Sequence, residues 1–199
     1  MAGAPARAPV VGLLLAGGRG SRFDGTGARN KLLAPIDGEP VVAHAARRLA
    51  AATDHCVAVI RPGVPGLREA LAPWVDQVVE CPEAASGMGH TMAFGAAHAR
   101  DGWRPRAVLV ALGDMPFVAP ATLARLVACA DDDAVIAVPR HGGERGHPVL
   151  FGRAHLDALT RLDGDRGAAA LLRDHPVRWI DVDDPGIVKD IDRPSDLPG

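Results

Sequence analysis

The sequence has little of what nucleic-acid and membrane proteins contain in abundance. Its 199 residues include no tyrosine, and aromatic residues make up only 4%, so the chain lacks a platform on which bases could stack. No apolar run approaches the roughly 20 residues that cross a bilayer. The net charge of −2 is far from the basic excess of a nucleic-acid or membrane-surface binder. We therefore expect neither nucleic acid nor a membrane among its partners.

Cysteine and lysine are also scarce. The three cysteines, Cys56, Cys81 and Cys129, are widely spaced and form no CxxC or Cys/His pattern. This usage predicts reduced thiols and a cytoplasmic protein. Lysine occurs only at Lys31 and Lys189 among 22 basic residues. Because the chain otherwise uses arginine, the compact ammonium of Lys31 suits a point contact to phosphate.

Short apolar runs alternate with amphipathic stretches along the chain. This alternation predicts an α/β fold: a single-domain, Rossmann-like, three-layer α/β/α arrangement with a mostly parallel central sheet. The length and the hydrophobic content of 48% predict one domain over 10–199, after a disordered segment 1–9 rich in alanine and proline. The expected strands are 10–15, 56–60, 77–80, 107–112, 134–138, 148–151 and 178–182, and the expected helices are 40–52, 64–71, 88–100, 120–130, 154–161 and 167–173.

The apolar run 10–15 ends in a glycine-rich loop that suits an anion. Glycines let the backbone approach a phosphate closely, and backbone N–H groups and nearby basic side chains supply positive charge. We expect the phosphates of a nucleotide to lie over this loop, close to Lys31. The loop residues concerned are Leu15, Ala16, Gly17, Gly18, Arg19, Gly20, Ser21 and Arg22.

Better-known phosphate-binding patterns do not fit this loop. A dinucleotide fingerprint needs a third glycine that opens a helix, whereas Phe23 follows Arg22 here. A Walker A loop needs a glycine before its lysine and a serine or threonine after it. In this chain Asn30 precedes Lys31, and Leu32 follows it. The loop therefore belongs to neither class.

Three polar or glycine-rich segments follow predicted strands. They are the glycine loop, the segment 83–89 after strand 77–80, and Gly-Asp-Met-Pro at 113–116 after strand 107–112. In a mostly parallel sheet, ligands bind outside the carboxyl ends of the strands. We therefore expect these three segments to line one crevice.

Asp114 stands directly after a buried strand and faces the expected anion site. A carboxylate there suits Mg²⁺ carried by a nucleotide, and the alternative is a turn or helix-capping aspartate. A second metal ligand is expected from Asp190 or Asp192, which point the same way in an extended segment. Most other acidic residues of the region 181–192 are expected to be solvated turn residues.

Several of these segments together resemble a known family. The pattern Leu-Leu-Ala-Gly-Gly-x-Gly-x-Arg-Phe at 14–23, with Lys-Leu-Leu-Ala-Pro at 31–35, is similar to the signature of the MobA-like nucleotidyltransferases. These form a branch of the large nucleotide-diphosphate-sugar pyrophosphorylase-type fold. The segment 112–116 looks like the family's metal-binding motif, and Gly-Met-Gly-His-Thr-Met at 87–92 resembles its nucleotide-site loop. The resemblance covers nearly the whole chain.

The second half of the chain resembles one subgroup in particular. Arg-Gly-His-Pro-Val-Leu-Phe at 145–151 and Gly-Asp-Arg-Gly at 164–167 look like acceptor-side motifs of the molybdenum cofactor cytidylyltransferases. The segment 190–197 is similar to their closing Asp-x-Asp-Thr-Pro-x-Asp-Leu, with Arg193 in place of the threonine. The stretch before Lys31 is longer than the family usually shows.

The resemblance implies an Mg²⁺-dependent enzyme. It would move CMP from CTP onto the phosphate of a molybdopterin-type cofactor and release pyrophosphate, with a molybdoenzyme or its chaperone as partner. An ionised acceptor phosphate needs no general base, so catalysis is positioning and charge neutralisation. The implied roles are catalysis for Lys31, Arg22 and Asp114, metal binding for Asp114, Asp190 and Asp192, further nucleotide contacts for Pro82, Gly87, Met88 and Gly113, and acceptor binding for Arg145, Gly146, His147 and Asp165.

Other functions stay open at this point. Gly17 gives Ala-Gly-Gly, which is more typical of the guanylyltransferase branch, so GTP is an alternative nucleotide. A different phosphorylated acceptor would make the chain another NTP transferase. Two alternatives come from other classes: a nicotinamide-dependent oxidoreductase with a degenerate Rossmann loop, and a non-catalytic nucleotide-binding or chaperone-like module. Metal dependence and pyrophosphate release separate a nucleotidyltransferase from both.

Overall fold

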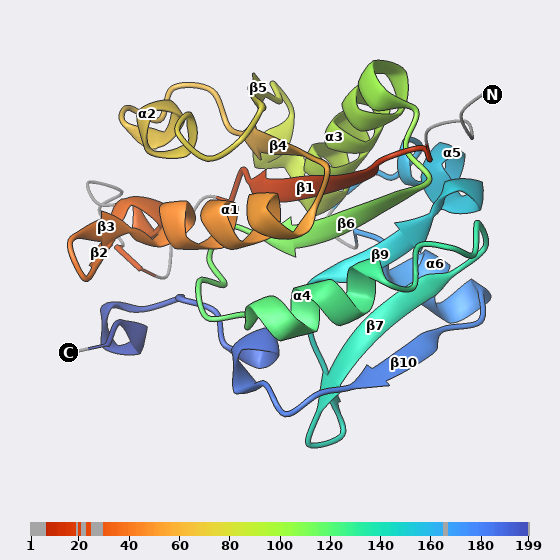
Figure 1. Ribbon diagram of the computed structural model, residues 1–199. Coiled ribbons are helices and arrows are strands. Elements are labelled where there is room, and N and C mark those ends of the chain that lie inside the picture. Colours follow the sequence, from red (N-terminus) through yellow and green to blue (C-terminus); the bar gives the residue numbers. More distant parts are fainter. Residues whose placement is uncertain (1–6, 19, 21–22, 25–29, 165–166, 199) are drawn as a thin grey trace, which may run out of the picture.

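The computed structural model is built around one large sheet (Figure 1). It describes residues 7–18, 20, 23–24, 30–164 and 167–198. The strand order is β10-β7-β9-β6-β1-β4-β5, and the short β8 pairs with β7. The strands are β1 (Val10–Ala16), β4 (His55–Ile60), β5 (Gln77–Glu80), β6 (Ala107–Leu112), β7 (Ile136–His141), β8 (Glu144–Arg145), β9 (Val149–Gly152) and β10 (Arg178–Asp181).

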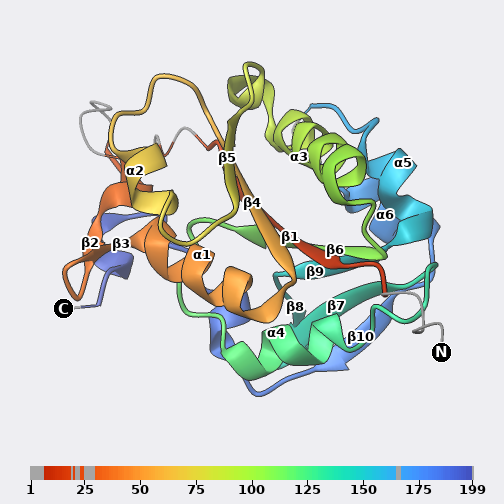
Figure 2. The ribbon, with the colours of Figure 1, turned by 45° about the horizontal axis from the view of Figure 1, so that its top comes forward.

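Helices cover both faces of the sheet (Figure 2). Helices α1, α2 and α4 pack on one face, and α3, α5 and α6 pack on the other. This arrangement confirms the predicted three-layer α/β/α fold. The helices are α1 (Val41–Ala52), α2 (Leu67–Leu71), α3 (Met88–Trp103), α4 (Pro120–Val127), α5 (Leu156–Leu159) and α6 (Ala169–Asp174).

The central strand β1 shows why the sheet is buried on both faces. All seven of its residues are buried, so it reads as a continuous apolar run. Leu13 packs with α3, whereas Leu14 packs with α1, because successive side chains of a strand point to opposite faces. Each leucine is fully buried, which stabilises the fold by about 1.5–3 kcal/mol per side chain. At Gly95 of α3 a Cβ atom would lie 2.3 Å from Leu13 Cδ1, so this glycine lets the helix approach the sheet closely.

The sheet is mostly parallel, as predicted, and β9 is the main exception. It runs antiparallel to both of its neighbours, β6 and β7. The start of β9 therefore lies at the same edge of the sheet as the carboxyl ends of β1 and β6. That edge carries the candidate site.

Some element bounds differ from the sequence expectation, and local geometry explains two of the differences. Strand β7 extends to His141, beyond the expected 134–138, because its last two residues pair with the antiparallel β8. Helix α2 begins only at Leu67, since Gly66 has the left-handed φ of 81°. A short hairpin of β2 (Pro35–Ile36) and β3 (Glu39–Pro40) was not expected.

The amino-terminal region was expected to be disordered over residues 1–9. Residues 1–6 of it lie outside the described part of the chain. The carbonyl oxygens of Ala8 and Pro9 accept hydrogen bonds from the side chain and the backbone N–H of Arg106, at 2.8 and 2.9 Å. Over the described residues, no helix is both long and apolar enough to cross a membrane.

Candidate active site

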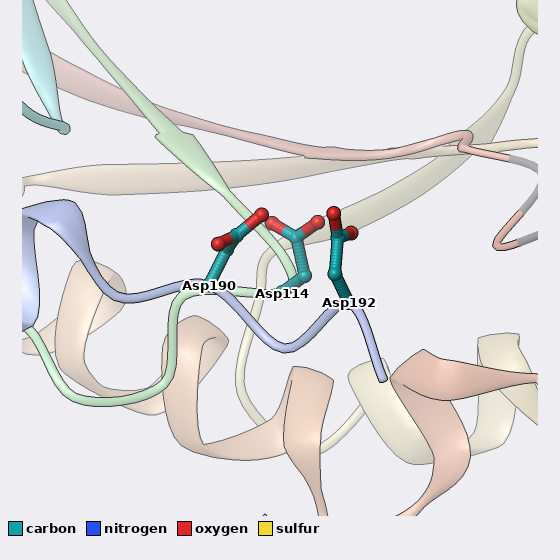
Figure 3. Close-up of side chains that lie close together, drawn as sticks. All are labelled: Asp114, Asp190 and Asp192. Atoms are coloured by element: carbon teal, nitrogen blue, oxygen red, sulfur yellow. The ribbon is translucent and has the colours of Figure 1, made fainter. Parts of the chain in front are cut away.

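Three aspartate side chains meet at the edge of the sheet where β6 ends (Figure 3). Asp114 follows β6, and Asp190 and Asp192 come from the C-terminal part of the chain. One carboxylate oxygen of each lies within 4.8 Å of the others. The N–H of Ile191 donates to the Asp114 carbonyl oxygen at 2.9 Å, which fixes the two segments side by side. Asp190 and Asp192 flank Ile191 and point the same way, so both carboxylates reach Asp114, whereas the sequence predicted a second ligand from one of them.

Lys31 completes this cluster. Its Nζ atom donates to Asp114 Oδ2 at 2.6 Å and to Asp192 Oδ1 at 2.8 Å, and the residue is only 8% exposed. Lys31 opens a short 3-10 helix (Lys31–Leu33), and the Asn30 side chain caps this helix by accepting from the Leu32 N–H. The local sequence therefore fixes the backbone from which the ammonium reaches the carboxylates.

The electrostatics of the cluster favour a further cation. Burial alone would lower the pKa of Lys31, but Asp114 and Asp192 more than offset it, so the pKa is raised and the ammonium stays charged. The pKa of Asp190 is also raised, first by burial and then by the neighbouring charges of Asp192 and Asp114. Three carboxylates thus face one ammonium. Oxygen donors of this kind and a local excess of negative charge fit Mg²⁺.

A hollow of about 330 Å³ opens next to Asp114, between the end of β1 and the start of α3. Five of the residues predicted to bind a nucleotide line it: Leu15, Gly17, Gly18, Gly87 and Met88. The first turn of the 16-residue helix α3 forms part of the wall, and the positive end of a helix dipole favours an anion there. The other lining residues are Ala84, Ala85, Thr91, Leu112 and Asp114.

Four of these lining residues were not predicted as contacts. Thr91 lies in the recognised motif 87–92, and Leu112 is the last residue of a predicted strand, so both had a sequence signal. Ala84 and Ala85 lie in the segment 83–89 that was expected to line the crevice, but alanine in a short 3-10 turn carries no chemical pattern that singles it out. Gly17 explains part of the shape: a Cβ atom there would lie 3.0 Å from the Ala84 Cβ and 3.1 Å from the Thr91 Oγ1.

Several predicted nucleotide contacts lie near the hollow but not in its wall. The N–H of Gly113 donates to the Leu15 carbonyl at 2.9 Å, and a Cβ at Gly113 would lie 3.3 Å from the Ala16 Cβ. Gly113 and Ala16 therefore pack against each other behind the wall. Gly20, with a φ of 62°, lies beside the stem of Lys31.

Other predicted residues are placed elsewhere or are not described. Pro82 lines a separate surface groove together with His90 and Phe94. Arg19, Ser21, Arg22 and Asp165 lie outside the described residues.

A second hollow contains three of the predicted acceptor-binding residues, Arg145, Gly146 and His147. Gly146 is required by close packing, since a Cβ atom there would lie 2.1 Å from the Ile187 carbonyl oxygen. The other lining residues are mostly apolar: Met88, Met92, Val110, Val138, Val149, Phe151, Gly167, Ala168, Ala169 and Leu172.

His147 is the main polar side chain that is buried in this second hollow. Its Nδ1 atom is buried and has no hydrogen-bond partner among the described residues. Burial lowers the pKa of its imidazole, Asp114 opposes this effect, and Arg145 adds to it. The imidazole is therefore neutral near pH 7, and a neutral imidazole that lines a hollow offers one donor and one acceptor nitrogen.

Met88 lines both hollows, so the two lie next to each other along the same edge. The three carboxylates and Lys31 stand beside the first. Two ligands bound side by side here would meet close to a cation site. Such an arrangement suits the transfer of a charged group from one ligand to the other.

The sequence matches the family model described as "MobA-like NTP transferase domain" over residues 12–179. Among characterised relatives, a molybdenum cofactor guanylyltransferase of Cupriavidus metallidurans is 28% identical over 200 residues, covering 96% of this chain and 94% of that protein. The bifunctional protein GlmU of Rhodospirillum rubrum is 32% identical over 160 residues, covering 76% of this chain and 34% of that protein. The chain spans about a third or a quarter of the length of the GlmU relatives that it matches.

Solved structures are similar over nearly the whole chain. The crystal structure of Rv0371c from Mycobacterium tuberculosis H37Rv has a TM-score of 0.78 and 30% identity, and the match covers 96% of each chain. The structure of an Rv0371C complex with manganese has a TM-score of 0.69 and 29% identity, covering 87% of this chain and 88% of that one.

Proposed function

The chain belongs to the family of MobA-like NTP transferase domains and is a nucleotidyltransferase, and from this premise we propose that it guanylylates a molybdopterin-type acceptor. A nicotinamide-dependent oxidoreductase is therefore set aside. The observation that carries the proposal is the pair of adjoining hollows, one lined by the glycine loop and Asp114, the other by His147. The likeness to a molybdenum cofactor guanylyltransferase over 94% of that protein supports the acceptor class.

The choice of GTP is supported by Gly17 and by the named relatives. Two of the relatives that match are molybdenum cofactor guanylyltransferases. Gly17 gives the Ala-Gly-Gly motif that is typical of the guanylyltransferase branch, and the absence of a Cβ there lets Ala84 and Thr91 pack close to the loop. CTP, the nucleotide that the sequence motifs favoured, is the competing substrate.

We assign the metal to Asp114 and Asp192, with Asp190 beside them. Their carboxylates fit Mg²⁺, and the manganese complex of the related Rv0371C supports a divalent ion in this fold. When bound, the ion would neutralise charge on the nucleotide's phosphates. Lys31 holds Asp114 and Asp192 in place and adds a fixed positive charge at the same point. Arg22, outside the described residues, is proposed to act beside Lys31.

The reaction needs little acid–base chemistry. An oxygen of the acceptor's phosphate forms a bond to the α-phosphorus of the NTP, the bond from that phosphorus to the bridging β-phosphate oxygen breaks, and pyrophosphate leaves. The attacking phosphate is ionised near neutral pH, because its second pKa is about 6. The chain's residues therefore position the two ligands and stabilise negative charge.

The acceptor is assigned to the second hollow. Arg145 lies at this hollow and can bind a phosphate, while the imidazole of His147 can bind a polar atom of the acceptor's ring system. Gly146 allows the loop to approach the C-terminal part of the chain, and Asp165 is proposed to complete the site. A molybdoenzyme or its chaperone is the proposed recipient of the product.

The test is pyrophosphate release from GTP, CTP, ATP and UTP, each with and without Mg²⁺, in the presence of purified molybdopterin-type cofactor. We expect Mg²⁺-dependent release with GTP and a dinucleotide product of matching mass. Release with CTP alone would assign the enzyme to the cytidylyl branch. Nucleotide binding without pyrophosphate release would support the non-catalytic module, and release without consumption of this cofactor would point to a different acceptor.

A further inference from the structure

We propose that Asp184 is a positioning residue for the metal-binding carboxylates. It holds the C-terminal segment 184–192 against the loop 113–119, and this contact places Asp190 and Asp192 beside Asp114. The inference rests on the proposed function, because that function assigns the metal to these carboxylates. Asp184 itself touches neither the carboxylate cluster nor the two hollows.

Asp184 is buried, whereas Asp181, Asp183 and Asp190 are exposed, as was expected of most acidic residues here. Its Oδ2 atom accepts from the Ala119 N–H at 2.9 Å and from the Thr122 hydroxyl at 2.6 Å. Its Oδ1 atom accepts from the Gly186 N–H at 3.0 Å. Asp184 as a whole is only 5% exposed. A buried carboxylate with these partners binds two distant parts of the chain to each other.

The C-terminal segment and the loop 113–119 lie side by side in opposite directions. Asp184 contacts Ala119 at one end, and Ile191 donates to the Asp114 carbonyl at the other. Between them Gly186 lies so close to the loop that a Cβ atom there would be 2.3 Å from the Phe117 carbonyl oxygen. These three contacts fix which residue of the C-terminal segment lies opposite which residue of the loop 113–119.

The register decides where the carboxylates point. In an extended segment, a slip of one residue turns every side chain to the opposite side. Such a slip would move Asp190 and Asp192 away from Asp114 together. Asp184 also caps the 3-10 turn Pro185–Val188 that leads to these residues, so it fixes the turn and the register at once.

The loop 113–119, against which the segment 184–192 packs, is itself held in place by hydrogen bonds. Arg48 of α1 donates to the carbonyl oxygens of Pro116 and Val118, the latter at 3.2 Å. The Ile187 carbonyl of the segment accepts from the His147 N–H at 2.9 Å. The segment therefore contacts both the metal-site loop and the acceptor loop, and Asp184 is the charged group that holds it there.

The test compares Asp184→Asn with wild type by hydrogen exchange over residues 186–193 and by Mn²⁺ affinity. In the amide, one oxygen is replaced by an NH₂ group that faces an N–H or hydroxyl donor. Loss of hydrogen bonds to a buried charge should make exchange in this segment at least about tenfold faster and raise the Mn²⁺ dissociation constant at least about fivefold. Thr122→Val removes a single bond and should shift both quantities in the same direction, by about two- to threefold.

Asp54→Asn is the matched control. Asp54 Oδ2 accepts from the Val10 N–H at 2.7 Å at the start of β1, the opposite end of that strand from the site. The control should leave the Mn²⁺ dissociation constant unchanged, even if the melting temperature falls.

A folded Asp184→Asn or Thr122→Val protein with wild-type exchange or wild-type Mn²⁺ affinity would overturn the proposal. If the wild-type protein binds no Mn²⁺, the metal assignment is wrong. Hydrogen exchange over residues 186–193 then decides alone whether Asp184 holds the segment.

Discussion

The amide nitrogen of Ile191 lies 2.9 Å from the carbonyl oxygen of Asp114, and this hydrogen bond joins two segments that are far apart in the sequence. On either side of Ile191, an aspartate faces the Asp114 carboxylate (Figure 3). The cation-binding set therefore exists only when the C-terminal segment is docked. A deletion that removes residues beyond 189 would leave Asp114 and Lys31 paired with each other but without the carboxylates of Asp190 and Asp192.

Lys31→Ala should lower turnover at least about tenfold while the fold stays intact, because it removes the fixed positive charge at the site. The change also leaves Asp114 and Asp192 without the ammonium that lies 2.6 and 2.8 Å from them. Pyrophosphate release measures the effect, and circular dichroism checks the fold. Arg68→Ala, a change at an arginine paired with Glu80, is the control for loss of a positive charge elsewhere. Unchanged kinetics in Lys31→Ala would remove this residue from the active site.

Asp114→Asn should weaken Mn²⁺ binding at least about tenfold, whereas Asp190→Asn should have a smaller effect. Asp114 is the more enclosed of the two and contacts both Lys31 and the C-terminal segment, while Asp190 is exposed. Titration of Mn²⁺ followed by electron paramagnetic resonance gives both dissociation constants. The reverse order of effects would contradict the assignment of Asp114 as the principal ligand.

Gly17→Ala should weaken GTP binding more than CTP binding. The new methyl group would stand 3.0 Å from the Ala84 Cβ and 3.1 Å from the Thr91 Oγ1, so the wall of the hollow must shift. Overpacking of this kind costs the folded protein about 1–3 kcal/mol, and we expect the shifted wall to raise the GTP dissociation constant roughly fivefold. Calorimetric titration with each nucleotide measures it. Gly102→Ala, where a Cβ would meet open space, is the matched control. Equal losses for both nucleotides would argue against Gly17 as a determinant of base choice.

His147 should make the stability of the protein depend on pH. Burial depresses the pKa of its imidazole below the ordinary value of 6.5, so the unfolded chain binds more protons than the folded one in the range below 6.5. The contribution of the neutral side chain is therefore present above 6.5 and is lost as the pH falls. His147→Gln should flatten this dependence when the free energy of unfolding is compared between about pH 8 and about pH 5. Parallel curves for the two proteins would contradict a depressed pKa.

Much of the fold could be predicted from local patterns. The alternation of apolar runs such as Val10–Ala16 with amphipathic helices was enough to predict the three layers, because a strand that is apolar throughout must be covered on both faces. The direction of β9 could not be predicted in this way. A buried strand of four apolar residues looks the same whether it runs parallel or antiparallel to its neighbours.

The residues of the candidate site differ in the same way, since some could be predicted from local patterns and others could not. Lys31, Asp114 and Asp192 carry chemistry in their residue types and stand at motif positions, so the sequence was sufficient to single them out. Asp184 resembles any turn aspartate in a run of acidic residues. Its importance comes only from long-range contacts with Ala119 and Thr122, which no local pattern contains.

Because β9 runs antiparallel to its neighbours, the two hollows are built by different parts of the chain. Residues up to Asp114 build β1, β6 and the wall of the first hollow, while the hairpin formed by β7, β8 and β9 brings His147 to the same edge from the other direction. The proposed acceptor loop and the wall of the first hollow therefore come from different parts of the chain, and the C-terminal segment that carries Asp190 and Asp192 contacts the acceptor loop through Ile187. A designer who exchanges this hairpin to change the molecule that receives the nucleotide must keep its contact with Ile187, because the same segment carries two carboxylates of the cluster.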